Sequence, residues 1–369
     1  MELTIPRSSI LPALERAAAA ADTKSTLPVL TNVLMRATPD SLALTATDLL
    51  VSVQIAVNAT VAKPGDALVP ARALLEAIKV MPEGEVKIVS GKALSVVVYA
   101  GKKKLTLIGM PPEDYITIAT PPAKLQPIPA RTIGTVIDRV RATMATDDTR
   151  ANMAAMLIEI DGTTLRAVAT DGHRLSMAEC ILPAAGDKFR ALVPTKGIEQ
   201  MRAILSTQGD GNVDIGAQSE AGPVFVRAGS VLFSSKLVDS AFPSYQQVIP
   251  AAGGHEARVN RAAMLDALRT VAVVSTDRAS GVRIAFGAEG GMLVATDNPD
   301  MGDAQEMLDA TVTGGTFAFG VNARYIVDAL RSVTCDEVSV NTSGELDPML
   351  IRQVGKEAEW CSVVMPMRI

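Results

Sequence analysis

LTATDLL (44–50), AVATDGHRL (167–175) and LVATDNPDM (293–301) share the tripeptide Ala-Thr-Asp, and these three copies decide the fold prediction. Their aspartates lie 123 and 126 residues apart. Each copy closes an alternating apolar stretch of the kind that forms a strand, a polar turn and a second strand. About 20 residues further on, a strand end, an amphipathic helix, a turn and another strand also recur. The chain is therefore predicted to contain three copies of one α+β unit with antiparallel sheets.

Two stretches rich in proline or glycine separate the copies. TPPAKLQPIPA (120–130) carries four prolines, and IPAAGGHEA (249–257) carries a proline and a glycine pair. The length of 369 residues also suggests two or three domains, at a prior of roughly 150 residues each. The predicted domains and linkers are 1–120, 121–130 (linker), 131–249, 250–256 (linker) and 257–369.

The composition is that of a globular protein, with 48% hydrophobic and 20% charged residues. We expect neither a signal peptide nor a membrane span, because no basic segment precedes an apolar run and no stretch reaches ~18 apolar residues. The cysteines, Cys180, Cys335 and Cys361, are far apart and form no CxxC pair. They favour a reducing cytoplasm and no metal site. We expect no cofactor.

Charge is divided unevenly between the predicted helices and the rest of the chain. The net charge of −5 alone argues against a nucleic-acid binder. Six predicted amphipathic helices nevertheless sum to +6, which leaves −11 on the remainder. One such helix is most often an ordinary solvated face, but six together predict a shared electropositive surface for phosphates. Aromatic residues are only 3%, so duplex backbone is favoured over stacked single strands.

Four stretches carry a family resemblance: STLPVLTNVL (25–34), TDGHRL (170–175), SSKLVDSAFPSYQQVIP (234–250) and VVMPMRI (363–369). They closely resemble the bacterial sliding clamp, the beta subunit of DNA polymerase III, and the resemblance covers the whole chain. It implies a ring-shaped, head-to-tail homodimer with helices lining the hole and antiparallel sheets outside. The implied function is processivity. The ring would encircle duplex DNA without sequence preference, slide on it, and tether polymerases and the clamp loader.

The resemblance also implies site residues, with no catalytic residue among them. In these clamps the turn matching TDGHRL belongs to a hydrophobic groove that captures short peptide motifs. Unbranched methionines suit a surface that accepts several peptides. The implied groove residues are Met153, Thr170, Gly172, His173, Arg174, Leu175, Pro243, Val248, Asn322, Tyr325, Leu346, Pro348, Val363, Met365, Pro366, Met367 and Arg368.

Contacts with DNA and with a second subunit follow in the same way. By resemblance Lys24, Arg72 and Lys196 lie at DNA-facing positions. The helix charges and the loop ATDDTRANM (145–153) add Lys79, Arg139, Arg150 and Arg202. The resemblance places the edge strand KKKLTLIG (102–109) against the third domain of a second copy. The implied dimer residues are Leu105, Leu107, Val273 and Val274.

Two alternatives remain for the same residues. Asp171, His173 and Ser176 imitate a hydrolase triad, but neighbours in one turn mostly point apart, and no GxSxG or Walker loop supports catalysis. The other alternative is a repeat scaffold that never touches DNA, which the basic helices disfavour. Asp48, Asp171 and Asp297 are predicted to have a structural role, each bonding the backbone of its own turn.

Overall fold

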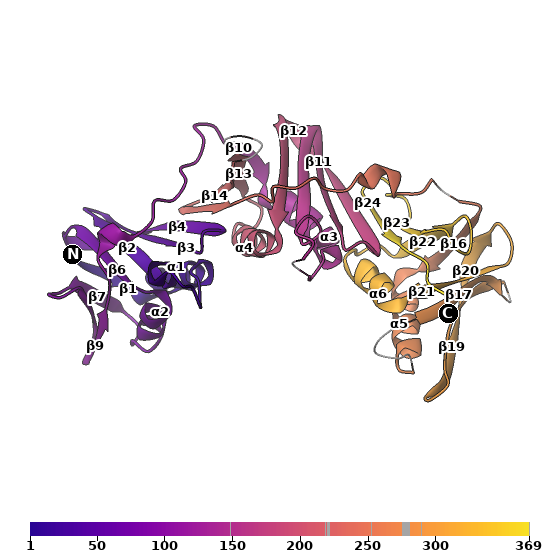
Figure 1. Cartoon of the computed structure of the whole chain (residues 1–369), viewed down its shortest axis with the longest axis horizontal. Coiled ribbons are helices and arrows are strands. Elements are labelled where there is room, and N and C mark those ends of the chain that lie inside the picture. Colours follow the sequence, from indigo (N-terminus) through magenta and orange to yellow (C-terminus); the bar gives the residue numbers. More distant parts are fainter. Residues whose placement is uncertain are drawn as a thin grey trace. The chain divides into compact units, whose positions relative to one another are not determined.

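The computed structural model describes residues 1–147, 149–217, 219, 222–251, 253–274, 281–288 and 290–368. The chain divides into two compact units (Figure 1). The first comprises Met1–Arg131 and Lys196–Leu237, and the second comprises Thr132–Thr195 and Val238–Ile369. Among the described residues no helix is long and apolar enough to cross a membrane.

The described residues contain six α-helices, and each begins directly where a strand ends. Asn260 and Asn322 cap the last two helices through side-chain oxygens that accept from Ala263 N at 3.0 Å and Arg324 N at 2.9 Å. The helices are α1 (Arg7–Ala20), α2 (Ala71–Lys79), α3 (Ala130–Val140), α4 (Thr195–Leu205), α5 (Arg261–Ala272) and α6 (Ala323–Arg331).

The first unit holds two sheets. A five-stranded sheet has the order β5-β1-β7-β8-β9, and an eight-stranded sheet has the order β10-β13-β14-β15-β4-β3-β2-β6. Their strands are β1 (Glu2–Pro6), β2 (Asn32–Thr38), β3 (Ser41–Thr47), β4 (Val51–Asn58), β5 (Thr60–Lys63), β6 (Gly65–Pro70), β7 (Glu85–Ser90), β8 (Ser95–Ala100), β9 (Lys103–Ile108), β10 (Gln126–Pro129), β13 (Asn212–Ala217), β14 (Val224–Ala228) and β15 (Val231–Ser235).

The second unit also holds two sheets. A seven-stranded sheet has the order β11-β12-β24-β23-β22-β16-β20, and a four-stranded sheet has the order β19-β18-β17-β21. Their strands are β11 (Ala155–Thr170), β12 (Arg174–Pro194), β16 (His255–Asn260), β17 (Gly281–Ala288), β18 (Gly291–Asn298), β19 (Gly302–Leu308), β20 (Ala310–Thr313), β21 (Phe317–Asn322), β22 (Glu337–Thr342), β23 (Met349–Gln353) and β24 (Trp360–Val364).

The strand pairings of the described residues are antiparallel, as predicted. Two of them join different sequence repeats: β15 pairs with β4, and β24 pairs with β12. The sheets therefore run across the repeat boundaries, and the second repeat contributes strands to both units. The core lies where each helix packs its apolar side, as α1 does with the fully buried Ile10, Leu14 and Ala17.

The three repeats can be aligned by their strand pairing, starting from the residue immediately before the second helix of each repeat. That residue is Pro70, Pro194 or Asn322, and it pairs with Asn32, Ala155 or Gly281 respectively. Continuing across the next strands, the series Leu34, Thr45, Gln54 of the first repeat matches the series Arg283, Ala295, Gln305 of the third. The register of the third repeat is thereby fixed against that of the first.

The first two Ala-Thr-Asp copies form the same capped turn. The Thr47 hydroxyl donates to the carbonyl oxygen four residues on at 2.7 Å, and so does the Thr170 hydroxyl. Asp48 Oδ1 accepts from the backbone N–H groups two and three residues on, at 2.9 and 2.8 Å. Asp171 Oδ1 does the same at 2.9 and 3.0 Å. Both aspartates thus hold their own turns, as predicted.

The third copy is displaced by one residue, so the role predicted for Asp297 is wrong. Thr296 donates instead to Gly281 O at 3.0 Å, and Asn298 Oδ1 accepts from Asp300 N at 3.0 Å. In the strand ladder Asp297 takes the place of Thr47, and its side chain lies on the exposed face of the sheet. In the third copy Asn298, and not the aspartate, accepts the backbone hydrogen bond within the turn.

Candidate functional site

The turn after β11 is tight and closely packed. Gly172 has φ +89°, a backbone conformation that favours glycine. A Cβ at this position would lie 3.0 Å from Arg150 Nη1 and 3.5 Å from Met153 Sδ. Both side chains therefore pack directly over the glycine, and any larger residue would have to push them aside.

Arg174 connects the second and third repeats through four contacts. Its Nε donates to Asp171 Oδ2 at 2.9 Å, its Nη1 to Asp328 Oδ2 at 2.8 Å, and its Nη2 to Ala142 O at 2.7 Å. The guanidinium also lies 4.4 Å from the centre of the Tyr325 ring. Its side chain is only 10% exposed, so Arg174 supports the shape of the site rather than offering a free charge. Sequence reasoning missed Asp328 as its partner.

The last residues of the chain lie beside this turn. β24 ends at Val364, and Met365 N then donates to His173 O at 2.9 Å. Met367 N donates to Gly320 O at 2.8 Å. Two backbone hydrogen bonds therefore tie down a segment that would otherwise fray.

Val363, Met365 and Met367 alternate along the sequence, which predicts that all three lie on one exposed side of an extended strand, but Val363 does not. Val363 is 1% exposed and belongs to a buried cluster with Leu175, Phe242 and Tyr245, whereas Met365 is 42% exposed. The strand is covered on both faces up to Val364, so only the residues after it can meet a ligand. Leu175 and Val363 therefore lie beneath the site.

The predicted groove residues all lie within the second compact unit. Three of the apolar ones are well exposed: Val248 at 41%, Leu346 at 66% and Met365 at 42%. His173 is also exposed, and its backbone oxygen accepts a hydrogen bond from Met365 N. Gly172 and Arg368 are also exposed, Thr170 is buried, and the half-buried residues are Met153, Arg174, Pro243, Asn322, Tyr325, Pro348, Pro366 and Met367.

The same geometry leaves no hydrolase triad. Ser176 is 2% exposed, accepts from Thr143 Oγ1 at 2.8 Å and donates to Ser362 Oγ at 3.1 Å. Asp171 is occupied by its turn and by Arg174. A nucleophile must be accessible and within reach of its base, and Ser176 is not accessible. Among the described residues no group of three His, Cys, Asp or Glu side chains could hold a metal ion.

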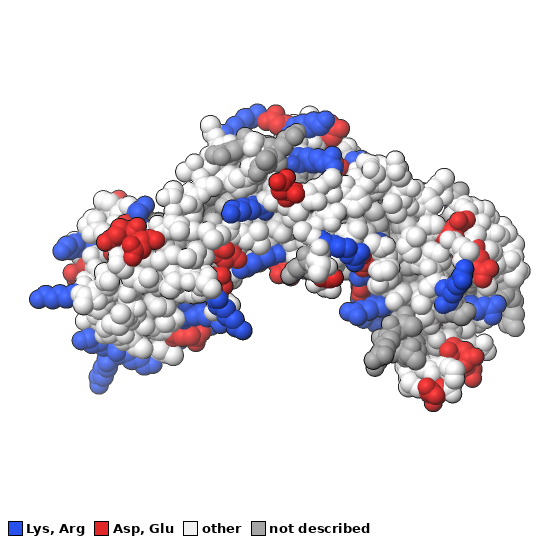
Figure 2. Space-filling view, viewed as in Figure 1, with Lys and Arg blue, Asp and Glu red and all other residues white. Residues whose placement is uncertain are grey.

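The basic charge of the helices is distributed evenly. α1 includes Arg7 and ends before Asp22 and Lys24, and α3 ends before Arg141, so each of the six described helices has a net charge of +1. The six described helices therefore sum to +6, the value predicted from the sequence. Figure 2 shows basic side chains at several places on each unit, with acidic side chains between them.

The predicted DNA residues differ in how free they are. Arg72 is exposed on α2, and Lys79 is exposed but forms an ion pair with Glu76 at 3.0 Å. Lys196 forms an ion pair with Asp48 and is 38% exposed. Lys24 and Arg150 are exposed, and Arg202 is half-buried. Asp148, part of the loop from which Arg150 was predicted, lies outside the described residues.

Arg139 contradicts its predicted DNA-facing position. Its side chain is 15% exposed, and Nη1 lies 3.6 Å from Glu359 Oε2. Its backbone carbonyl accepts from Trp360 Nε1 at 3.2 Å. Arg139 therefore packs against the start of β24 instead of facing solvent.

The predicted dimer residues lie at unpaired edges. Leu105 and Leu107 are half-buried on β9, which ends its sheet, and Val273 is 73% exposed just after α5. Val274 is half-buried. Among the described residues β19 also stands at the end of its sheet, with one edge unpaired.

Comparison with known proteins gives the family. Models of the DNA polymerase III beta subunit match in order: the N-terminal domain at residues 1–119, the central domain at 127–244 and the C-terminal domain at 246–368. A beta sliding clamp of Pseudomonas aeruginosa is 34% identical over 100% of both chains. A solved structure of a sliding clamp from that species, bound to griselimycin, has a TM-score of 0.94 at 32% identity and 100% coverage of both chains. A beta sliding clamp of C. crescentus has a TM-score of 0.93 at 27% identity and covers 100% of this chain and 99% of its own. Three consecutive domain matches and this full-length likeness show that the chain belongs to the DNA polymerase III beta subunit family, the beta sliding clamps.

Proposed function

We propose that two copies of this chain close head to tail into a ring around duplex DNA and hold a DNA polymerase there. As a beta sliding clamp the chain is a processivity factor and not an enzyme, so the hydrolase alternative is wrong. One observation carries the proposal of a closed dimer. The last strand of the second repeat, β15, pairs with β4 of the first, and the last strand of the third, β24, pairs with β12 of the second. The corresponding strands β9 of the first repeat and β19 of the third each keep an unpaired edge.

The two internal joints share one register. In the first, Val231 of β15 lies opposite Ile55 of β4, and in the second, Trp360 of β24 lies opposite Ala178 of β12. Val231 and Trp360 are each the first residue of their strand. Ile55 and Ala178 each lie eight residues after the threonine of their capped turn. Since the register recurs, we apply it to the two free edges.

A joint between β9 of one copy and β19 of the other then has a definite pairing. Lys103, the first residue of β9, would lie opposite Glu306, which takes the place of Ile55 in the third repeat. Leu105 would lie opposite Ala304. Opposite charges directly across an antiparallel pair stabilise it by roughly 0.2–1 kcal/mol. The predicted register is therefore favourable in charge.

Burial at the edges supports the same joint. Leu105 is half-buried, whereas its counterparts in the internal joints, Phe233 and Ser362, are 0% and 1% exposed. Val273 is 73% exposed at the end of α5. A bare strand edge with apolar neighbours invites aggregation unless something covers it. A second copy would cover both edges and bury these side chains.

We assign DNA contact to basic side chains on or next to the helices that remain accessible. These contacts would be to phosphates, which attract basic groups without reading sequence and weaken with salt. The proposed residues are Lys24, Arg72, Lys79, Arg150, Lys196 and Arg202. Arg139 is a poorer candidate, because only 15% of its side chain is exposed beside Glu359.

We also propose that the surface formed by His173, Val248, Leu346 and Met365 receives peptide motifs of polymerases and the clamp loader. Met365 lies beside the turn held by Arg174, and exposed apolar side chains such as Met365, Val248 and Leu346 mark a binding site. A relative has been solved with griselimycin bound, and another with PEG at a putative beta-motif tethering region.

The proposed domain limits stay at 1–120, 131–249 and 257–369, with linkers between them. The family models cover 1–119, 127–244 and 246–368, so the first two agree with these limits to within five residues and the third begins eleven residues earlier. The compact units divide the chain differently because sheets cross the boundaries. We place the protein in the cytoplasm, where its three free cysteines would stay reduced.

Retention on circular DNA tests the proposal. The protein, loaded by its clamp loader on nicked circular DNA, should remain through a salt wash that strips ordinary phosphate binders and should leave when the circle is cut. Arg72→Glu should reduce loading, while Lys92→Glu, the same charge change in a hairpin loop, should not. Equal loss from circular and linear DNA would exclude a ring.

A further inference from the structure

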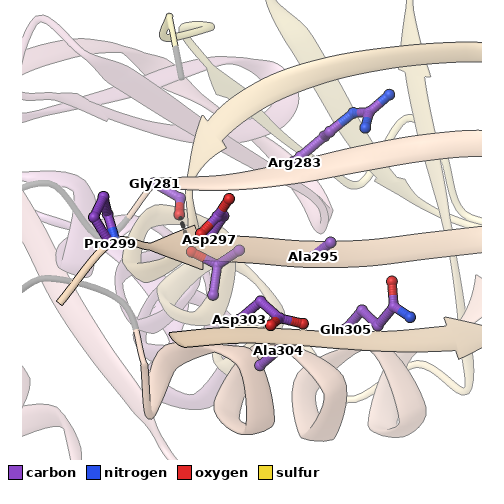
Figure 3. Close-up of a pocket in the computed structure, with 9 residues that line it drawn as sticks. Gly281, Arg283, Ala295, Asp297, Pro299, Asp303, Ala304 and Gln305 are labelled. Atoms are coloured by element: carbon purple, nitrogen blue, oxygen red, sulfur yellow. Dashed lines mark hydrogen bonds between the residues drawn. The ribbon is translucent and has the colours of Figure 1, made fainter. Parts of the chain in front are cut away.

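A hollow of about 490 Å³ lies on the exposed face of the sheet formed by β17, β18 and β19 (Figure 3). Asp297 on β18 lies directly opposite Asp303 on β19, and Arg283 on β17 is the one basic residue that lines the hollow. The sequence prediction assigned none of its residues to a site. The lining residues are Gly281, Arg283, Ala295, Thr296, Asp297, Pro299, Asp303, Ala304 and Gln305.

The equivalent place in the second repeat is filled by the chain itself. There Ala155, Leu157, Val168 and Leu175 occupy the positions of Gly281, Arg283, Ala295 and Asp303. These four residues are buried in one cluster with Phe242 and Tyr245, which come from the segment that follows β15. Tyr245 is 3% exposed, and its hydroxyl donates to Glu159 Oε2 at 2.9 Å.

The first repeat shows this arrangement in part. Tyr115, in the segment after β9, donates from its hydroxyl to Thr45 O at 3.3 Å, and a smaller hollow of about 230 Å³, lined in part by Leu34, Thr45 and Gln54, remains on this face. Thr45 is the counterpart of Ala295, which lines the hollow. Two repeats therefore place a tyrosine from the segment after their last strand on this face of the sheet.

A recurring backbone hydrogen bond leads the chain onto this face. Met110 N donates to Leu68 O at 2.9 Å, and Val238 N donates to Leu192 O at 2.9 Å, in each case a few residues before the tyrosine. Met367 N makes the corresponding bond to Gly320 O at 2.8 Å. In the third repeat, as far as the described residues extend, the face beyond this bond is the hollow.

The hollow differs from its counterparts in charge. Arg283 and Asp303 stand where the second repeat has Leu157 and Leu175, and Asp297 stands where it has Thr170. Two carboxylates directly opposite each other destabilise an antiparallel pair, and a cation between them would relieve the repulsion. The apolar contacts of the second repeat are thus replaced by an acidic rim, and no aromatic side chain is among the described residues that line the hollow.

We propose that this hollow is a second peptide-docking site, which takes an extended segment of a partner protein with an aromatic side chain next to a lysine or arginine. The aromatic ring occupies the position that Tyr115 and Tyr245 occupy in the other repeats, over Ala295. The basic side chain lies between Asp297 and Asp303. The site lies within the third repeat, and its residues Asp303, Ala304 and Gln305 belong to β19, the edge proposed to pair with β9 of a second copy, so the peptide would bind beside that joint.

The test uses the full chain and a labelled peptide with the sequence of residues 238–249, VDSAFPSYQQVI, carrying Gln246→Lys, which places a lysine next to the tyrosine. Ala295→Trp fills the hollow, and the pair Asp297→Asn with Asp303→Asn removes its charge. Each should raise the Kd of this peptide, the tryptophan variant by about tenfold or more, as loss of a central aromatic contact does. Replacing the tyrosine of the peptide with alanine should weaken binding similarly.

His173→Ala, at the proposed groove for polymerase motifs, is the matched control and should leave this peptide's Kd unchanged. If Ala295→Trp melts below the parent, the paired asparagine variant decides the outcome. Unaltered binding by the properly folded variants overturns the proposal, as does weakening by His173→Ala alone, since the peptide would then occupy the groove. No measurable binding to the parent protein also overturns it.

Discussion

Replacing Arg174 with alanine is expected to loosen the junction of the second and third repeats. The guanidinium makes charged hydrogen bonds to Asp171 and Asp328, one to Ala142 O, and a contact with the Tyr325 ring. The side chains of Arg174, Asp171 and Asp328 are 10%, 15% and 25% exposed. These charges are therefore only weakly screened by water, and losing the arginine leaves two carboxylates without their partner.

The expected loss is about 3–4 kcal/mol. Hydrogen bonds to charged groups contribute roughly 1.5–3 kcal/mol each, and breaking a buried ion pair costs roughly 3–5 kcal/mol. The lower part of that range applies because Asp328 can regain water at the surface. For a unit of this size such a loss lowers Tm by roughly 6–16 °C.

Calorimetric unfolding of Arg174→Ala, Asp328→Ala and the double variant measures the effect. The coupling between the two side chains should be about 1–3 kcal/mol. The control is Arg324→Ala, which removes an exposed arginine from α6, the helix that carries Asp328. Its free energy of unfolding should stay within about 0.5 kcal/mol of the parent value. An Arg174→Ala protein as stable as the Arg324→Ala protein would refute the role given to this junction.

Three further predictions concern the dimer, the groove and the thiols. Lys103→Glu or Glu306→Lys alone should shift sedimentation toward monomer by about tenfold in Kd, and combining them should restore the dimer; failure of this rescue would contradict the proposed register. His173→Ala should weaken a polymerase-motif peptide by about 1–2 kcal/mol in calorimetry with no change in Tm, and an unchanged affinity would place the groove elsewhere. Burial raises the pKa of the Cys361 thiol to about 11, so at pH 8 it should react with DTNB far more slowly in the native protein than in urea, and equal rates would disprove its burial.

The repeats could be predicted from the sequence because each carries the same order of helix, strand and turn patterns. Their exact frame could not. Identical letters place Thr296 with Thr170, yet the third turn contains one residue more between its paired strands, and the ladder moves Asp297 into the threonine position. Register depends on which residues pair across the strands, and a shared tripeptide does not determine that.

The candidate site was located by its family resemblance, but the roles of its residues depend on long-range contacts. Arg174 meets Asp328, 154 residues away, and Arg139 meets Glu359 on another repeat. Helical periodicity counts both arginines as surface charges because it records which face is polar and not what covers that face. Val363 likewise fits an exposed alternating strand by pattern, although neighbouring strands and the 242–245 segment bury it.

The strand pairing between repeats means that the central one is not a separable module. Within the chain its β15 is completed by β4 of the first repeat, and its β12 by β24 of the third. A fragment containing only the second repeat would expose two unpaired sheet edges, at β15 and β12, and each could pair with a similar strand of another molecule. This fragment should self-associate, whereas a fragment of two adjacent repeats keeps one of the joints and should remain better folded. Gene duplication of a single copy would have needed a ready-made partner for those edges from the outset, and self-association would have supplied it.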